Sequence, residues 1–327
     1  MDAALYWLVR SVVALLQSLP LEVVARLGRA GGALAYVLDG RHRRVALRNL
    51  TMCLGSEKSP AEIQALAREN FRRIGEAFAC SVKTAGMTWD QLRSRVEFSG
   101  QIETLNPAGN ESRRRIVAAI GHFGNFELYA RWRDYAGGAR CATTYRGLRQ
   151  PGLNRLLQSL RERSGCEYFE RRTDAPLLRA YMNQPGVMLG LLADQHAGNS
   201  GLRLPFLGHD CSTSAAPAVF ALRYHCALHT GICYRVGLAR WRIEAGPEIP
   251  TLENGVHRTP EAIMLDVNRA FEAAVRRDPA NWFWVHNRWK PAKAKPPDSP
   301  ATPAQPGAGT VSGNPSASAG QGEVIPE

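Results

Sequence analysis

The segment Gly121–Glu127 (GHFGNFE) holds the side chains of this chain best suited to acid–base chemistry. His122 follows an apolar run, Ile116–Ile120, that is typical of a buried strand, and Glu127 falls in the helix predicted over Asn125–Trp132. Open α/β sheets bind ligands at the carboxyl ends of their strands, where this histidine is expected. A carboxylate that holds one ring nitrogen of an imidazole leaves the other nitrogen free to accept a proton. The segment therefore predicts a histidine that acts as a base.

Glu127 is the carboxylate that we expect on this imidazole. Residues five apart on a single helix point about 140° away from each other, but a histidine in the preceding loop lets the chain fold back. Gly124 favours a close approach of the backbone to a ligand. Because no Ser or Cys nucleophile accompanies the pair within the segment, it suits direct deprotonation of a substrate hydroxyl. The alternative is a partly buried histidine beside a surface glutamate.

The middle of the chain alternates short apolar strands with helical segments. This alternation predicts an α/β fold, with a mixed, mainly parallel central sheet flanked by helices. The predicted strands are Ile116–Ile120, Cys166–Phe169, Val187–Ala193 and Gly231–Leu238. The predicted helices are Pro60–Thr84, Asn125–Trp132, Leu153–Arg163, Ala175–Met182, Ser214–His229 and Pro260–Arg276.

Two apolar helical segments, Ala3–Leu19 and Leu21–Leu38, stand near the start of the chain. The first carries Arg10 and Gln17 on one face and leucines on the opposite face. A spanning helix needs about 20 mostly apolar residues, so this segment suits the membrane interface better than a span. The basic stretch 41–48 follows both segments, and its cations would bind the anionic lipids of the cytoplasmic leaflet. A signal peptide begins with a basic region, and no such region precedes these segments. The alternative is an amphipathic core helix with a solvated basic end.

Composition limits the class of protein and its partners. The chain has 327 residues, 45% apolar and 21% charged, which excludes a largely disordered chain, a fibrous repeat and a polytopic membrane protein. Its net charge is +12, and only five of its 41 cationic residues are lysines. Guanidinium groups bind phosphate and carboxylate, which points to nucleic acid, anionic lipid or an acidic carrier protein. The seven cysteines are scattered without a paired spacing, which fits a reducing compartment.

Several blocks of the sequence agree with one known family. Gly121–Glu127 resembles the His-x4-Asp/Glu motif of the glycerolipid acyltransferase superfamily, and most closely that of the late acyltransferases of lipid A biosynthesis, the lauroyl and myristoyl transferases. The resemblance covers about residues 40–290, in the same order and spacing. Its other blocks are Thr144-Tyr145-Arg146 with Gln150-Pro151, Arg161-x-Arg163-x-Gly165, Ala193-Asp194-Gln195, Gly201, Pro205–Gly208 (PFLG) and Asn281–Lys290 (NWFWVHNRWK). Leu207 and Asn287 depart from the family's usual Phe and Arg, which leaves the acceptor open.

The resemblance implies a glycerol-3-phosphate acyltransferase-like fold and a defined reaction. A fatty acyl chain would move from an acyl carrier protein thioester to a hydroxyl of a lipid A precursor. His122 would be the general base, and Glu127 would fix its tautomer. Backbone N–H groups at the start of the Asn125 helix, or Arg146, would stabilise the oxyanion at the carbonyl. The reaction needs no acyl-enzyme, no cofactor and no metal.

The substrate-binding candidates are Gly124, Asn125, Arg146, Arg161, Arg163, Asp194, Gln195 and Arg288. The arginines suit phosphate on the acceptor or carrier, or, in the alternative, a solvated helix face. Asp194 and Gln195 follow a buried strand and open onto the same crevice as His122, or else fix a loop by hydrogen bonds. Arg288 is expected to position the sheet edge or a phosphate.

The predicted organisation has three parts. Residues 1–40 are membrane-associated helices, 41–290 an acyltransferase domain, and 291–327 a disordered tail with eight prolines and no aromatic residue. The resemblance implies a location at the cytoplasmic face of a bacterial inner membrane. The expected partners are acyl carrier protein, the lipid acceptor and an anionic membrane surface. Nucleic acid is disfavoured because no known binding module accompanies the charge.

Three alternatives stay open. In the first, the acceptor is a different lipid, such as a lysophospholipid, an aminolipid or a mannosylated lipid. In the second, the donor is coenzyme A. In the third, the protein binds lipid without turnover. No Gly-x-Ser-x-Gly elbow, Walker A loop or dinucleotide fingerprint occurs, so hydrolase, NTPase and dehydrogenase functions lose support. His225, Cys226, His229 and Cys233 have a partial zinc spacing, but they run from a predicted helix into a strand, which favours packing.

Overall fold

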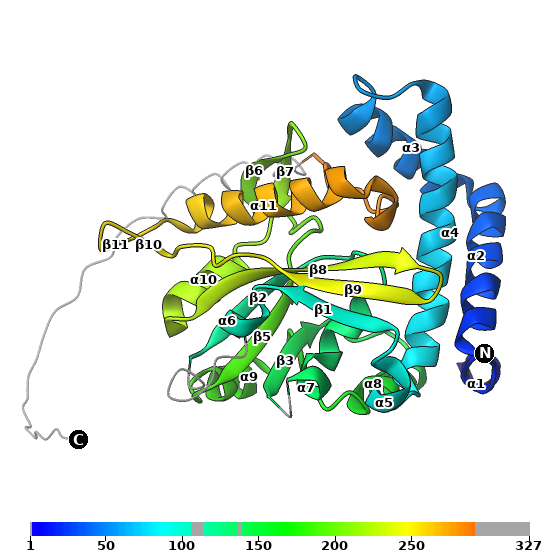
Figure 1. Cartoon of the computed structure of the whole chain (residues 1–327), viewed down its shortest axis with the longest axis horizontal. Coiled ribbons are helices and arrows are strands. Elements are labelled where there is room, and N and C mark those ends of the chain that lie inside the picture. Colours follow the sequence, from blue (N-terminus) through cyan, green and yellow to red (C-terminus); the bar gives the residue numbers. More distant parts are fainter. Residues whose placement is uncertain (1, 106–113, 137–138, 292–327) are drawn as a thin grey trace, which may run out of the picture. The chain divides into compact units, whose positions relative to one another are not determined.

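The structure is a computed structural model that describes residues 2–105, 114–136 and 139–291. One compact unit spans Met1–Ala292 (Figure 1). The predicted disordered tail, 291–327, lies outside the described residues except for Pro291. The boundary predicted at residue 40 stays a prediction.

A seven-stranded sheet forms the centre of this unit. Neighbouring strands run parallel except for β8 and β9, which are antiparallel. This arrangement confirms the mixed, mainly parallel sheet predicted from the sequence. The strand order is β1 (Val96–Gly100), β9 (Arg240–Ala245), β8 (Ala227–Gly237), β2 (Ile116–Ile120), β5 (Val187–Leu192), β3 (Arg140–Tyr145) and β4 (Glu167–Glu170).

Two hairpins and the helices surround the sheet. The hairpins pair β6 (Leu202–Phe206) with β7 (His209–Thr213) and β10 (Leu252–Glu253) with β11 (Val256–His257). The helices before β2 are α1 (Asp2–Ser18), α2 (Leu21–Leu38), α3 (Gly40–Leu54), α4 (Pro60–Ala85), α5 (Trp89–Leu92) and α6 (Ile102–Leu105). Those after β2 are η2 (Phe126–Arg131), α7 (Trp132–Tyr135), α8 (Pro151–Glu162), α9 (Ala175–Met182), α10 (Ala216–Tyr224), α11 (Pro260–Arg277) and η3 (Pro279–Asn281).

Side chains of the central strands alternate between the two faces of the sheet, as the strand period requires. Val117 and Leu189 belong to the main core, which includes residues of α9, α10 and α11. Ile116 and Met188 face the other way and share a second cluster with Trp132 of α7. Figure 1 shows α11 and the β6–β7 hairpin on one side of the sheet and α7 and α8 on the other. The sheet is therefore covered on both faces, as predicted.

The first helices pack along the edge of this unit through glycines. A Cβ atom on Gly32 of α2 would lie 2.1 Å from the carbonyl oxygen of Phe71 in α4, and one on Gly75 would lie 2.1 Å from the carbonyl oxygen of Gly28. Only glycine permits this close approach of two helix backbones. The sequence thus fixes α2 against α4, beside the sheet (Figure 1).

The outer faces of these helices carry large apolar side chains. Trp7, Leu8 and Leu15 of α1 and Val37 and Leu38 of α2 are exposed, Trp7 to 61%. None of the helices in the described ranges is sufficiently long and apolar to span a membrane. The association of the N-terminal helices with a membrane therefore stays a prediction.

Two predicted helices differ from the structure. The helix predicted over Ser214–His229 is wrong beyond Tyr224: α10 ends there, His225 adopts the left-handed conformation (φ 51°), and β8 begins at Ala227. Pairing of β8 with both β2 and β9 in the sheet interior prevails over the local helical pattern. The helix predicted over Asn125–Trp132 is instead the 3-10 helix η2, followed by the short α7.

Candidate active site

Strand register brings His122 beside Asp194. In the parallel pair β2–β5, Ile120 lies opposite Leu192, and the two site residues each stand two positions further along. The Nδ1 atom of His122 lies 2.8 Å from Oδ1 of Asp194. The backbone N–H of His122 donates to Oδ2 of the same carboxylate, also at 2.8 Å. The carboxyl ends of two adjacent parallel strands thus build a histidine–carboxylate pair.

Asp194 is held from several directions. Its side chain is 1% exposed, and Oδ2 also accepts the indole N–H of Trp282 at 2.9 Å. The guanidinium of Arg288 donates to its backbone carbonyl oxygen at 2.6 Å. Burial raises the pKa of this carboxyl. The charge and the hydrogen bonds of His122, together with the charge of Arg288, outweigh burial and lower the pKa to about 2. Asp194 is therefore an anion at neutral pH.

An anionic acceptor at Nδ1 fixes the tautomer of His122. Nδ1 carries the proton that is donated to Asp194, and Nε2 keeps its lone pair. The ring packs against Phe126 and Phe283, with ring centroids at 4.8 Å and 5.8 Å, and the side chain is 16% exposed. A histidine held in this way suits a general base at Nε2.

His122 lines an open cleft of about 810 Å³, which we call the groove. The walls of the groove come from α4, η2, α8, the loops after β3 and β5, and the segment after η3, which contributes His286. Its lining includes Phe78, Val82, His122, Phe126, Arg146, Leu160, Arg171, Gln195, His196, Ser214 and His286. Apolar and cationic side chains thus meet around His122.

The carboxylate on Nδ1 of His122 is that of Asp194, and the orienting role predicted for Glu127 stays a prediction. Glu127 is bound by Arg161 of α8 instead: Nη2 donates to Oε1 at 2.7 Å and Nε donates to Oε2 at 3.3 Å. Glu127 belongs to the 3-10 helix η2, which Tyr129 anchors to β8 by accepting the N–H of Cys233 at 2.9 Å. Glu127 therefore lies on the groove wall and faces α8.

Arg161 is also committed to contacts within the protein. Its guanidinium carbon lies 5.8 Å from the ring centroid of Tyr145 and 5.2 Å from that of Tyr168. Burial lowers the pKa of Arg161, but the hydrogen bond and charge of Glu127 raise it more. The free phosphate-binding role predicted for Arg161 does not agree with this ion pair.

Of the other arginines predicted to bind substrate, Arg146 lines the groove, and its side chain is exposed. Arg163 is exposed at the end of α8 and is not among the described residues that line the groove. Arg288 is fully buried: its guanidinium donates to Asn268 at 2.7 Å and lies 3.8 Å from the ring centroid of Phe206. Arg288 therefore supports Asp194 from behind and is closed to a substrate phosphate.

Of the remaining candidates, one lines the groove and two hold the loop that carries His122. Gln195 lines the groove. Gly124 has φ 50°, and a Cβ atom there would lie 2.6 Å from the carbonyl oxygen of Cys233, so its role is close packing of the loop on β8. Asn125 is buried, and its Oδ1 accepts the hydroxyl of Ser81 at 2.7 Å. Gly124 and Asn125 thus hold the loop that carries His122.

Sequence reasoning missed three contributions to the site. The indole of Trp282 donates to Asp194. His196 and His286 both line the groove, and Nε2 of His286 accepts the backbone N–H of His196 at 3.1 Å. Burial lowers the pKa of His286 to about 4, which keeps this ring neutral at physiological pH. Trp282 and His286 both belong to the block Asn281–Lys290, for which the sequence analysis names no role besides that of Arg288.

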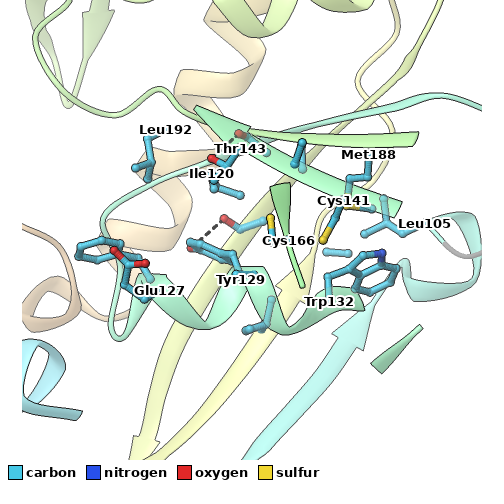
Figure 2. Close-up of a pocket in the computed structure, with 18 of the residues that line it drawn as sticks. Leu105, Ile120, Glu127, Tyr129, Trp132, Cys141, Thr143, Cys166, Met188 and Leu192 are labelled. Atoms are coloured by element: carbon cyan, nitrogen blue, oxygen red, sulfur yellow. Dashed lines mark hydrogen bonds between the residues drawn. The ribbon is translucent and has the colours of Figure 1, made fainter. Parts of the chain in front are cut away.

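A second, apolar cavity lies behind the groove, between the sheet and η2. We call it the chamber; it has a volume of about 100 Å³. Small residues on this face of the sheet, Ala118, Gly190 and Gly231, leave the space. Figure 2 shows Glu127 and Leu192 toward one end of the chamber and Trp132 and Leu105 toward the other. Groove and chamber share Phe126, Glu127, Ala130, Thr144, Tyr145, Arg161, Tyr168 and Leu192.

The residues with partial zinc spacing have separate places. His225 ends α10, and the Nδ1 atom of the buried His229 lies 3.0 Å from the carbonyl oxygen of Gly246. Cys233 lies further along β8, against Asn125. Within the described ranges, no group of three or more His, Cys, Asp or Glu side chains is placed to hold a metal ion.

Comparison with known proteins agrees with the motifs. Residues 1–291 match the family described as bacterial lipid A biosynthesis acyltransferase. The chain is similar to the lipid A biosynthesis palmitoleoyltransferase of Escherichia coli (strain K12), with 27% identity over 296 residues that cover 88% of this chain and 91% of that protein. It has the same identity and coverage with the lipid A biosynthesis acyltransferase of Shigella flexneri. The resemblance drawn from the sequence is thus confirmed, and the chain belongs to the bacterial lipid A biosynthesis acyltransferase family.

Proposed function

We propose that this protein transfers a fatty acyl chain from a thioester donor to a hydroxyl group of a lipid A precursor. The observation that carries the proposal is the His122–Asp194 pair at the wall of a groove that adjoins an apolar chamber. The family supports an acyl transfer and a lipid acceptor. His122 is the proposed catalytic base, and Asp194 is the proposed positioning carboxylate.

The reaction needs one base that later returns its proton. Nε2 of His122 takes the proton of the acceptor hydroxyl while its oxygen attacks the thioester carbonyl carbon. The carbon–sulfur bond then breaks, and the thiolate leaves with the proton from the imidazolium. Asp194 stabilises the imidazolium between the two steps, because its carboxylate stays ionised at Nδ1. The products are an ester and a free thiol.

The chamber is the proposed site of the acyl chain. Its walls are apolar, with Ile120, Met188 and Leu192 from the sheet and Tyr129 and Trp132 from the facing helices (Figure 2). Burial of methylene groups contributes about 0.8 kcal/mol each, so each group of the chain that enters the chamber adds to the affinity. The thioester then lies in the groove, near His122.

Exposed cations at the groove suit an anionic donor and acceptor. Arg146 and Arg171 line the groove and are exposed. They are proposed to bind phosphate of the lipid acceptor or of a phosphopantetheine arm, by charge-assisted hydrogen bonds. Acyl carrier protein is the proposed donor, since an acidic protein complements a chain of net charge +12.

The N-terminal helices are proposed to hold the protein on the cytoplasmic face of the bacterial inner membrane. Tyr6 of α1 lies against the start of α8, where a Cβ atom on Gly152 would be 3.4 Å from its ring. The exposed apolar face of α1, with Trp7 and Leu8, therefore borders the helix that supplies Leu157 and Leu160 to the groove. A lipid acceptor then reaches the groove without crossing water.

Membranes that contain the protein, incubated with labelled acyl carrier thioester and separate acceptors, test this function. We expect transfer to the lipid A precursor, and its loss in His122→Ala. Transfer to lysophospholipid alone contradicts the lipid A assignment, and transfer from coenzyme A alone contradicts the carrier-protein donor. Lipid binding with no turnover from either donor assigns the protein to the non-catalytic class instead.

A further inference from the structure

Two cysteines stand side by side in the wall of the chamber. Cys141 is the second residue of β3, and Cys166 comes immediately before β4. In the parallel pair β3–β4, Ala142 lies opposite Glu167, so each cysteine comes one position before a paired residue. Both cysteines pack in the cluster on the chamber side of the sheet, and both line the chamber (Figure 2). Two thiols from neighbouring strands therefore face one cavity.

The two side chains are in direct contact. The thiol groups are free and are hydrogen-bonded to each other. The S–H of Cys166 has a second acceptor in the carbonyl oxygen of Glu167, at 3.7 Å. Disulfides join cysteines whose Cα atoms are about 4.4–6.8 Å apart, and neighbouring strands are about 4.8 Å apart. A bond between the two sulfurs therefore needs little movement of the backbone.

Polar contacts favour the thiolate of Cys141. The hydrogen bond from Cys166 lowers the pKa of Cys141 most, and the backbone N–H and the charge of Arg133 lower it further. Burial and the charge of Asp134 act in the opposite direction without outweighing them. Gly165 lets Arg133 lie close, because a Cβ atom there would be 2.8 Å from its Cδ. Since the thiolate is the nucleophilic form, Cys141 has the surroundings of a reactive cysteine.

Three other cysteines have the opposite surroundings. Burial raises the pKa of Cys53, Cys80 and Cys226 to about 12, so their thiols stay protonated at neutral pH. None of the three is among the described residues that line the groove or the chamber. They are inert packing cysteines by comparison with the pair in the chamber.

The chamber limits which molecules reach the pair. Its volume of about 100 Å³ compares with about 30 Å³ for a molecule of liquid water, so it admits only small reagents. It adjoins the open groove through the residues that both cavities share. The side chains of Cys141 and Cys166 are 5% and 8% exposed. Hydrogen peroxide is small enough to meet these thiols, whereas a bulky disulfide such as oxidised glutathione is not.

We propose that Cys141 and Cys166 form a dithiol site in the chamber that small peroxides oxidise to a disulfide. The thiolate of Cys141 attacks one oxygen of hydrogen peroxide, the O–O bond breaks, and the departing hydroxide takes up a proton to become water. The sulfur of Cys166 then attacks the sulfenic acid: the S–S bond forms, the S–O bond breaks, and a second water leaves with the thiol proton. Two thiols and one peroxide give one disulfide and two waters. Neither step involves an acyl donor or acceptor, so the proposal stands apart from the proposed function.

Thiol counting after peroxide treatment tests the proposal. The folded full chain is incubated with dilute hydrogen peroxide, unfolded with an alkylating agent present, and analysed by mass spectrometry. We expect two of the seven thiols to be lost, with a disulfide between the peptides of Cys141 and Cys166. This reaction is expected to be about tenfold faster than oxidation of any other cysteine. Dithiothreitol is expected to restore all seven thiols, and oxidised glutathione to leave the pair reduced.

Single variants distinguish the two thiols. Cys166→Ala is expected to stop at a sulfenic acid on Cys141, which dimedone traps, and Cys141→Ala is expected to lose the fast reaction. Cys226→Ala is the matched control, because it removes another buried cysteine and leaves the pair intact. Circular dichroism confirms that each variant is folded.

Arsenite is a second probe, which needs no oxidant. Arsenous acid exchanges two of its hydroxyl groups for two neighbouring thiols and releases two waters. We expect one arsenic atom per folded chain in the wild-type protein and in Cys226→Ala, and none in Cys141→Ala or Cys166→Ala.

The results that would overturn the proposal are distinct. All seven thiols of the folded protein could remain free after peroxide treatment, or the disulfide could join a different pair. Equal arsenic binding by Cys141→Ala would also contradict a site made of these two thiols. A sulfenic acid that forms on Cys166 in Cys141→Ala, and not on Cys141 in Cys166→Ala, would overturn the assigned order of attack. Each measurement reads the site itself and is valid whether or not the protein transfers acyl chains.

Discussion

His122 with Asp194 and Glu127 with Arg161 both join a carboxylate to a nitrogen side chain, yet different parts of the fold build them. The first pair lies just beyond β2 and β5, whose register places the two loops side by side. The second joins a 3-10 helix to the end of α8, two elements without a common hydrogen-bond ladder. The partner of His122 is therefore set by the sheet, while the partner of Glu127 depends on how a helix packs.

This difference has a functional meaning. A pair fixed by strand register keeps its geometry to within small limits, as a proton-transfer step requires. A pair between packed helices borders the space where the acyl chain is proposed to lie. The proton transfer is thus assigned to the first pair, and variants of the two pairs should lower the transfer rate to different extents.

Loss of the base is expected to have the largest effect. His122→Ala removes the proton acceptor, so we expect the transfer rate to fall by about 1,000-fold, within the range of general base catalysis. Circular dichroism checks that the variant is folded, because loss of the ring takes one hydrogen-bond partner from the buried Asp194. The rate is measured with labelled thioester. A rate within about fivefold of wild type would remove His122 from the mechanism.

Asp194→Asn is expected to come next. The amide keeps the shape of the side chain but removes the charge that stabilises the imidazolium, so kcat should fall by about 100-fold. Glu127→Gln is the matched control, and its kcat should fall less. If Glu127→Gln lowers kcat more than Asp194→Asn, Glu127 and not Asp194 is the carboxylate on which the base depends.

Trp282→Phe tests the support behind the carboxylate. The change removes the indole N–H that donates to Asp194 Oδ2 at 2.9 Å and keeps an aromatic ring. We expect kcat to fall by about tenfold, since one donor is lost and the bonds to His122 remain. Trp284→Phe offers a control, because its indole N–H donates to the carbonyl oxygen of Pro279 instead. Equal effects on kcat would show a general packing effect.

Ala118→Leu tests the chamber. The larger side chain occupies space on the sheet face that lines it, so we expect about fivefold lower kcat/KM for the longest accepted chain relative to shorter ones. Ala119→Val, on the opposite face of β2 in the main core, is the control for overpacking. A uniform loss across all chain lengths would place the acyl chain elsewhere.

A pH-dependent stability is the smallest expected effect. Burial lowers the pKa of His286 to about 4 in the folded protein, against about 6.5 for an unperturbed ring. Between these values the unfolded chain binds the extra proton, so stability is lost as pH falls from 6.5 toward 4. Urea unfolding at pH 7 and pH 5 should show a smaller loss for His286→Gln than for wild type. An equal loss contradicts the assignment.

The sequence supports much of this fold because its signals are local. Runs such as Ile116–Ile120 and Val187–Leu192 are apolar on both faces, as buried parallel strands are, and the structure confirms them. The sheet type follows from their alternation with helices. Strands such as β3 (RCATTY) carry polar residues, and their place depends on pairing with neighbours that the local pattern does not contain.

The sequence predicts only part of the site, because local patterns do not show which strands are neighbours. The sequence predicts both His122 and Asp194 at strand ends, but local patterns do not contain the order of the strands, which makes β2 and β5 neighbours. Without that order, the sequence favours Glu127, the nearest carboxylate along the chain, as the partner of the imidazole. The identity of the carboxylate on His122 therefore required three-dimensional information.

Proton NMR of the protein with labelled histidine tests the central claim most directly. A strongly hydrogen-bonded Nδ1–H of His122 should give a low-field resonance that is absent in His122→Ala. We expect this resonance to remain in Glu127→Gln and to move or disappear in Asp194→Asn. A resonance that persists in Asp194→Asn and is lost in Glu127→Gln would contradict the account.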